Sequence, residues 1–277
     1  MSLEKWLIKP GETTVIDLEI VRKLKVGLIR GQVDIIGHDE PGARVEVHSV
    51  AGKELKVSMD GDTLEIDHPQ LRWDNFIEVF SSFRGSARAD VSVLVPRDVA
   101  LKFGVVSSTG LISGLHADAK ISTVSGDVVI DKMVGDLDLN AVNGELSVRD
   151  QVGRINAHTI SGDITASGAI EKFSADSVSA DIFLDATGSP DQISTNTVSG
   201  NTTIRLSEGL GARFNINTVS GRLQLDDKYI TGVRGKGYNA TSGSLHGSWV
   251  EVRCNSVSGN VSVVRRAAET HSEEASA

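Results

Sequence analysis

Thr123-Val124-Ser125-Gly126-Asp127 is the clearest form of a motif that recurs along the second half of the chain. Close variants begin at Ala141, Thr159 and Ser177, and shorter Val-Ser-Gly forms occur further on. The fourth position of this motif falls at residues 126, 144, 162, 180, 200, 221 and 259, so the first three steps are 18 residues and the next two are 20 and 21. A period in this range is typical of repeat architectures, in which each repeat stacks on its neighbours. The sequence therefore predicts an all-β chain that forms a single-chain β-solenoid with about 18–21 residues per coil.

The small residue of each motif is expected to form a tight turn, because glycine accepts backbone conformations that other residues avoid. The repeat turns that we predict are centred on Gly126, Gly144, Gly162, Gly200, Gly221 and Gly259. The serine before each glycine is expected to form a side-chain hydrogen bond at the corner.

Apolar residues keep a fixed place within each coil. In the coil that opens at Val124 they are residues 124, 128, 130, 134, 137 and 139, and the residues 18 and 36 positions later are apolar too. We expect all of them, Val142 and Ile160 included, to point into one axial core. The unequal spacing excludes a hexapeptide left-handed β-helix, and the absence of Gly-Gly-x-Gly-x-Asp excludes the calcium-binding nonapeptide repeat. The register loosens across 226–248, where we expect an inserted loop around a degenerate coil at 241–245.

Three regions follow along the chain. Residues 1–100 are β-rich, with alternating stretches such as Thr14–Ile20 and an Asp60-Gly61 hairpin signal. The solenoid repeats occupy residues 101–264. Residues 265–277 have no pattern and many small or charged residues, so we expect a disordered tail.

An aromatic excursion at 68–88 breaks the β pattern and holds three of the seven phenylalanines and one of the three tryptophans. These side chains either plug the solenoid or form a patch for a partner. In the second case the contacts would come from arginine and aromatic residues, which are frequent interface anchors. The predicted partner-binding residues are Arg72, Trp73, Phe76, Phe80, Phe83 and Arg84.

The composition limits the classes of function. The 277 residues carry 37 acidic and 28 basic side chains, a formal charge of −9, which disfavours nucleic acid as a partner. The single cysteine, Cys254, cannot form an internal disulfide and is in phase with inward-facing positions. No apolar run is long enough for a signal peptide or an integral membrane segment, so we expect a cytoplasmic protein.

Candidate catalytic and metal-binding residues are few. The residue after the turn is acidic in four successive coils, at Asp127, Glu145, Asp163 and Asp181. Such a column is either a weak calcium edge or a set of solvated turn residues. The seven histidines show no HxH or HExxH spacing, and no Gly-x-Ser-x-Gly elbow occurs. We therefore expect no enzyme, no metal and no cofactor.

The chain resembles a known bacterial family over roughly residues 15–264. The resemblance lies in the motif Val-Ser-Gly-Asp-Val-x-Ile at Val124–Ile130, the hairpin Asp60–Ile66 and the strand Val91–Pro96. These are similar to the putative-adhesin family, a β-strand-repeat domain of unknown function. The resemblance implies the repeat fold and brings no catalytic residues with it.

The leading hypothesis is a non-enzymatic structural or interaction module that presents a rigid solenoid face to an unidentified protein partner. One alternative is a scaffold like the bactofilins, in which uncapped solenoid ends polymerise through exposed edge strands. Another is a surface adhesin or carbohydrate-binding protein. A homo-oligomer is compatible with each of these.

Overall fold

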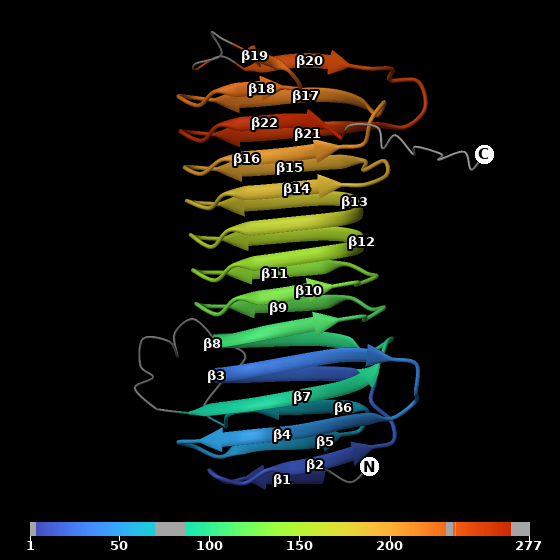
Figure 1. Cartoon of the computed structure of the whole chain (residues 1–277), viewed down its shortest axis with the longest axis vertical. Helices are drawn as coiled ribbons and strands as arrows, with labels where there is room; N and C mark the ends of the chain where they lie inside the picture. Colours follow the sequence, from blue (N-terminus) through green and yellow to red (C-terminus); the bar gives the residue numbers. More distant parts are fainter. Residues whose placement is uncertain (1–3, 70–86, 231–234, 236, 267–277) are drawn as a thin grey trace, which may run out of the picture.

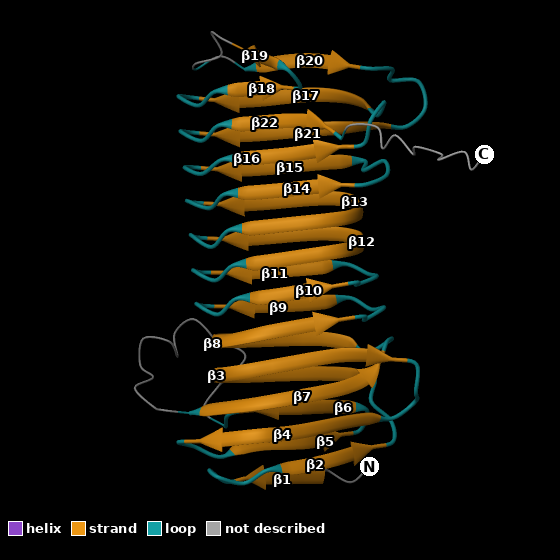
Figure 2. Ribbon diagram, viewed as in Figure 1, coloured by secondary structure: helices purple, strands orange, loops and turns teal. Residues whose placement is uncertain are grey.

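The computed structural model describes residues 4–69, 87–230, 235 and 237–266. Every helix or strand assigned within these ranges is a β-strand (Figure 2), so the prediction of an all-β chain is confirmed. The described residues contain no helix that is long and apolar enough to cross a membrane. Residues 70–86, the greater part of the aromatic excursion, and residues 267–277 of the predicted tail lie outside the described ranges.

Two sheets face each other along the stack, and the Val-Ser-Gly turns join them at one edge (Figure 1). The first sheet contains the strands that lead into these turns. Its parallel strands, in spatial order, are β6 (Thr63–Asp67), β3 (Lys23–His38), β8 (Ala100–Ser113), β9 (Ala119–Thr123), β11 (Leu137–Ala141), β12 (Leu146–Thr159), β13 (Ile164–Ser177), β15 (Gln192–Thr197), β21 (Trp249–Ser256) and β17 (Gly211–Thr218).

The second sheet contains the strands that leave the turns. Its parallel strands, in spatial order, are β7 (Arg88–Pro96), β3, β8, β10 (Val128–Asp131), β12, β13, β14 (Ile182–Ala186), β16 (Thr202–Leu206), β22 (Val261–Arg265) and β18 (Leu223–Leu225). β3, β8, β12 and β13 are long enough to bend at an edge and belong to both sheets. Between β10 and β14 the paired residues, such as Val128 with Leu146, are 18 positions apart.

Antiparallel strands cover both ends of the parallel stack. At the N-terminal end β5 (Leu55–Asp60) pairs with β6 and with β1 (Glu4–Ile8), while β4 (Ala43–Ala51) pairs with β7 and with β2 (Thr14–Leu18). The predicted hairpin at Asp60-Gly61 joins β5 to β6. At the other end β20 (Tyr238–Ser242) pairs with β17, and β19 (Lys228–Ile230) pairs with β18.

The last coil of the sequence lies inside the stack and not at its end. β21 pairs in parallel with both β15 and β17, and β22 pairs with both β16 and β18, so this coil separates two coils that precede it in the sequence (Figure 1). The degenerate coil expected at 241–245 is not formed. Residues 238–242 form antiparallel β20 instead, because the chain reverses there before it returns into the stack.

The core lies between the two sheets as one continuous apolar cluster. Val128, Ile130 and Leu139 are fully buried, as predicted, and so is Cys254 at 1% exposure. The prediction was wrong for the corner residues, since Ile160 at 53% and Val134 and Val152 at 43% are exposed. Beyond Ile160, the exposed residues at the Val-Ser-Gly corner are Val178, Val198, Val219 and Val257.

The reason for this correction lies in the glycine of the corner. A Cβ at Gly162 would lie 1.9 Å from the carbonyl oxygen of Gly144, and one at Gly126 would lie 1.8 Å from that of Ser108. The inward place at the corner therefore has no room for a side chain in these two coils, and in the coil of Val178 it holds only the small, fully buried Ala180. The valine two residues earlier points outward, and the strand residues on either side supply the core.

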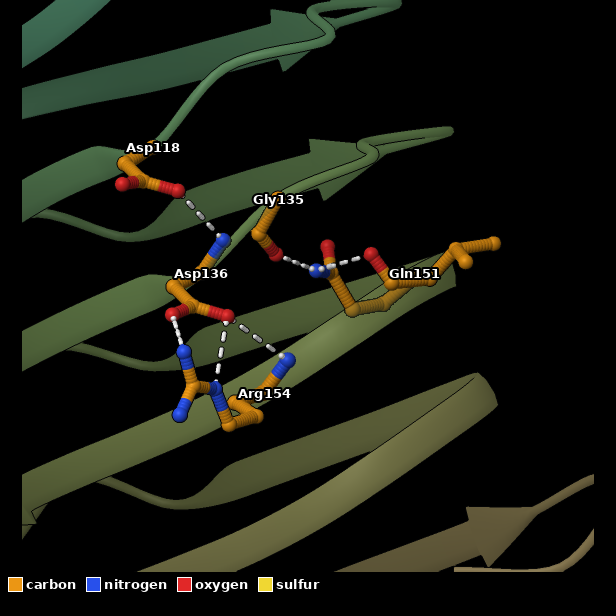
Figure 3. A network of polar contacts seen from close by, with 6 residues as sticks. Asp118, Gly135, Asp136, Gln151 and Arg154 are labelled. Carbon is orange, nitrogen blue, oxygen red and sulfur yellow. Dashed lines mark hydrogen bonds and ion pairs between the residues drawn. The ribbon is translucent and has the colours of Figure 1, made fainter.

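Aspartate side chains join the coils by capping backbone N–H groups. Asp163 accepts a hydrogen bond from the backbone N–H of Asp181 at 2.9 Å, and Asp181 accepts one from Asn201 at 2.7 Å. Figure 3 shows the same device at the opposite edge, where Asp118 accepts from Asp136 at 2.9 Å. This capping explains the acidic column at the turns without a metal ion. It also explains why Asn201, whose amide oxygen can accept the same bond, continues the column.

A salt bridge and a buried amide add to this opposite edge (Figure 3). Arg154 donates through Nη2 to Asp136 Oδ2 at 2.6 Å, which holds the pKa of that carboxyl below its usual value. The fully buried Gln151 donates to the Gly135 carbonyl at 2.6 Å. The buried polar group is thus tied to the backbone of the preceding coil.

Candidate functional site

The outward-facing corner residues form a regular column, which we call the valine ladder. The backbone carbonyl of each member except the last accepts the N–H of the serine after the corner residue of the next coil, for example Val178 from Ser199 and Val198 from Ser258, both within 3.0 Å. The serine hydroxyls donate to the same carbonyls, as Ser161 does to Val142 at 3.2 Å. These bonds fix the spatial order of the ladder, which is Val142, Ile160, Val178, Val198, Val257 and Val219.

The exposure of this column changes sharply along the stack. Below Val142 the same column continues through Val124 and Val106, which are 4% and 7% exposed and cluster with Ile29 and Ala87. From Ile160 onward every member is exposed by between 47% and 56%. Aliphatic side chains at the same corner position are thus buried in the coils of Val106 and Val124 and exposed in the coils from Ile160 onward.

A second column runs beside the valine ladder on the outer face of the first sheet, and we call it the amide ladder. It consists of His158, Asp176, Asn196, Asn255 and Asn217. Asn196 donates to Asp176 at 2.7 Å, Asn255 to Asn196 at 2.8 Å and Asn217 to Asn255 at 2.9 Å. His158 Nδ1 lies 3.2 Å from Asp176 Oδ2, and both side chains are 46% exposed. The side chains therefore form a chain of polar contacts across five coils.

The two ladders line a groove. The larger part of the groove lies at the C-terminal coils and has a volume of about 640 Å³. It is lined by the whole amide ladder and by the valine ladder from Val178 to Val219, together with Gly235 and Gly237. A further hollow of about 410 Å³ is lined by residues from Lys120 to Ile160. Because His158 and Thr159 line both, the two hollows form one elongated groove along the Val-Ser-Gly edge.

Hydroxyl groups fix the shape of the groove wall. Thr159 Oγ1 accepts the N–H of Gly162 at 3.0 Å, and Ser256 Oγ accepts that of Gly259 at 2.8 Å. Each hydroxyl lies between an amide-ladder residue and a valine-ladder residue in the sequence and holds the corner in which the valine points outward. Side-chain capping of this kind rigidifies a turn.

The predicted partner-binding residues Arg72, Trp73, Phe76, Phe80, Phe83 and Arg84 lie outside the described residues, so this prediction stays a prediction. Among the residues that the structure does describe, no group of three or more His, Cys, Asp or Glu side chains could hold a metal ion. Burial raises the pKa of the Cys254 thiol to about 11, which makes this cysteine a poor nucleophile.

The groove residues were visible in the sequence but were misinterpreted. Asn-Thr-Val or a close variant precedes Ser-Gly at Asn196, Asn217 and Asn255, and His158 and Asp176 occupy the same place in their coils. A polar column beside each corner valine indicates an outer face, because strand residues alternate between the two faces of a sheet. The period of the apolar residues alone predicts that the corner valines point into the core, and this prediction is wrong.

Comparison with known proteins agrees with this architecture. The family model Toastrack DUF4097, for a domain of unknown function, matches residues 21–264. The chain belongs to this family. The resemblance inferred from the Val-Ser-Gly motif is thereby confirmed. No curated protein matches the chain.

Among the solved structures that match the chain are three bacterial proteins. A putative lipid binding protein from Parabacteroides distasonis is 13% identical, with 94% of this chain and 98% of that chain covered and a TM-score of 0.52. A putative cell adhesion protein from Clostridium sporogenes is 14% identical, with 96% and 99% covered and a TM-score of 0.29. A putative adhesin from Bacteroides fragilis is 10% identical, with 92% and 98% covered and a TM-score of 0.33. At these identities the Parabacteroides structure supports a shared fold and nothing further.

Proposed function

We propose that this Toastrack DUF4097 chain is a non-enzymatic interaction module, a β-solenoid whose Val-Ser-Gly edge binds an elongated segment of a protein partner. One observation carries the proposal. The column that contains the valine ladder is buried at Val106 and Val124, where it packs with Ala87, and about half exposed in the ladder from Ile160 to Val219. Contiguous apolar surface rimmed by polar side chains is typical of an interaction site.

The chemistry of the groove supports binding over catalysis. Its described lining consists of aliphatic side chains, amides, glycines and hydroxyls that cap turns, together with Lys120 and the pair His158–Asp176. An activated nucleophile needs a neighbouring base that is itself oriented by a third group. The one histidine of this lining faces a carboxylate and an amide, Asn156 at 3.2 Å, and does not face a hydroxyl or thiol.

The ends of the stack favour a discrete particle over a polymer. Polymerisation through solenoid ends needs free strands that continue the parallel ladder. Here β5 and β4 cover one end of the parallel stack and β20 and β19 the other, all in antiparallel orientation. The outermost strands β1, β2, β19 and β20 are only three to five residues long, and very short edge strands are one way of blunting a sheet edge.

Paired variants at the two edges of the coil test the proposal. Val178→Asn/Val198→Asn makes the groove polar, whereas Val134→Asn/Val152→Asn makes the same change at residues of similar exposure on the opposite edge. Isothermal titration calorimetry would use three defined probes, namely a proline-rich peptide, an extended Val-Thr-Arg peptide and a linear hexose oligosaccharide. We expect a peptide probe to bind the unmodified chain, with at least tenfold loss in the groove variant and no loss in the control. Binding by no peptide, or equal loss in both variants, would contradict the proposal.

A further inference from the structure

The groove has properties that select one class of occupant, and this inference rests on the proposed function. The area of the valine ladder argues against a second copy of the chain. Full burial of one aliphatic side chain removes roughly 60–120 Å² from water, so five half-exposed residues offer about 150–300 Å². A stable protein–protein interface needs about 800 Å² from each partner. A narrow ligand that lies along the groove fits this strip better than a second folded surface.

Most backbone groups along the groove are already paired. Every ladder carbonyl up to Val257 accepts a bond from the next coil, and the N–H groups of Val142, Ile160, Val257 and Val219 donate to the preceding coil. A peptide that binds as a β-strand needs a free strand edge with which to pair. The groove crosses the strands and presents side chains. An occupant therefore cannot form the backbone hydrogen bonds of a β-sheet with it.

The spacing of the ladder distinguishes the conformations that remain. Neighbouring strands are about 4.8 Å apart, so every second ladder residue repeats at about 9.6 Å. A polyproline II helix repeats every three residues, or about 9.3 Å, and makes no internal hydrogen bonds. An extended strand repeats on one face at about 6.8 Å and loses register within one coil. An α-helix presents an apolar stripe more than about 100° wide, and the single-file ladder does not match it.

The amide ladder supplies the polar contacts that such a helix needs. A side-chain amide has two N–H donors, and Asn196 and Asn255 each use one within the ladder. The second donor of each could serve a polyproline II backbone, whose carbonyls have no partner of their own. These two donors lie in adjacent coils beside Val198 and Val257, so they can hold the middle of such a peptide.

The charge around the ladder favours basic residues in the peptide. Asp163 and Asp181 are exposed and lie three residues beyond Ile160 and Val178 in the same turns, so the acidic turns flank the part of the groove at these two coils, whereas Asn201, Asn260 and Arg222 hold this place beside the rest of the ladder. The chain as a whole has a formal charge of −9. Attraction of this kind raises the association rate of a cationic partner and decreases with salt.

We infer that the groove binds a basic, proline-rich segment of a protein partner in the polyproline II conformation. The ladder from Val142 to Val219 spans five coil steps, which is about 24 Å. A polyproline II helix of about eight residues covers that length. Two of every three residues pack against the valines and the amides, and the third, arginine or lysine, faces the acidic turns.

Calorimetry with nine-residue peptides tests this inference on the full-length chain. The probe is (Pro-Pro-Arg)₃, and the controls are (Pro-Pro-Glu)₃, with reversed charge, and (Gly-Ser-Arg)₃, with equal charge and a flexible backbone. We expect the probe to bind at least tenfold more tightly than either control. Val178→Asn/Val198→Asn should weaken it at least tenfold and Val134→Asn/Val152→Asn should leave it unchanged. Asn196→Ala/Asn255→Ala should weaken binding several-fold, with a small fall in the unfolding midpoint because the exposed amide bonds between these coils are lost.

Each other outcome overturns a defined part of the account. Equal binding of (Gly-Ser-Arg)₃ would show that charge alone suffices and would refute the polyproline II inference. Groove-dependent binding of the extended Val-Thr-Arg peptide, without binding of (Pro-Pro-Arg)₃, would leave the proposed function standing and refute the inference. Groove-dependent binding of a linear hexose oligosaccharide alone would refute the protein partner as well. Binding that the groove variant and the opposite-edge variant reduce equally would refute both proposals.

Discussion

Gly126→Ala tests the physical reason for the outward valine ladder. A Cβ at residue 126 would lie 1.8 Å from the carbonyl oxygen of Ser108 and 2.8 Å from its carbon. An ordinary contact requires the two coils to separate locally by roughly 1.5 Å. Overpacking of this size costs about 1–3 kcal/mol. The separation also weakens the bond between the coils from Ser125 N–H to Val106 O, which contributes about 0.5–1.5 kcal/mol.

We therefore expect Gly126→Ala to lower the free energy of unfolding by about 3 kcal/mol and Tm by roughly 6–12 °C. Gly42→Ala is the matched control. The nearest atom to a Cβ there is the Leu18 carbonyl oxygen at 3.1 Å, so a change within about 1 kcal/mol is expected. Equal effects of the two substitutions in urea unfolding would refute the steric account of the corner.

Hydrogen exchange adds a spatial test of the same prediction. Each coil contacts only its neighbours, so the damage in a stacked array is local. Amides of β8 and β10 should exchange faster in Gly126→Ala, while those of β21 keep the rate of the unmodified chain. Uniformly faster exchange along the stack would contradict this local coupling.

Three further predictions follow from buried groups. Burial lowers the pKa of His68 to about 4, so between pH 6.5 and 4 the unfolded chain binds a proton at this residue and the folded chain does not. The free energy of unfolding should therefore decrease by about 3 kcal/mol as the pH falls from 6.5 to 4. In urea unfolding across this range, His68→Gln should not show this decrease. A pH dependence of the unfolding free energy equal to that of the unmodified chain would contradict the role given to His68. Cys254 should resist iodoacetamide in the folded chain at mildly alkaline pH and react fully in denaturant, as followed by mass spectrometry, and rapid modification of the folded chain would contradict its burial. Burial alone would raise the pKa of Asp185, but hydrogen bonds from Arg205 and Arg266 outweigh this effect and lower the pKa. Asp185→Asn should therefore lower the free energy of unfolding by about 1–3 kcal/mol at neutral pH, where the carboxylate is charged. The same substitution should have a much smaller effect below the pKa of Asp185 in the folded chain.

Much of the fold could be predicted from the sequence because the coil is a local unit. The 18-residue step places Val128 beside Leu146 and Leu137 beside Ile155, which is the register that the structure shows. The hairpin at Asp60-Gly61 followed from its turn residues in the same way. These features depend on short stretches of chain whose side-chain period is visible in the sequence.

The order of the coils and the position of the groove could not be predicted in this way. The insertion of β21 and β22 between earlier coils depends on contacts between distant segments, and each coil carries the same Val-Ser-Gly signal whichever neighbour it meets. The groove was missed because Ile160 and Val178 repeat in phase with true core residues. Whether a corner residue points inward depends on the closeness of the neighbouring carbonyl, which is a distance between coils.

Methyl NMR of isoleucine- and valine-labelled protein, titrated with (Pro-Pro-Arg)₃, tests the central claim most directly. The methyl signals report contact at individual residues in the folded chain and separate the two edges of the coil. The account predicts shifts at Ile160, Val178 and Val198, with no change at the equally accessible Val134 and Val152. Shifts confined to the opposite edge, or no shifts in the valine ladder at saturating peptide, would contradict it.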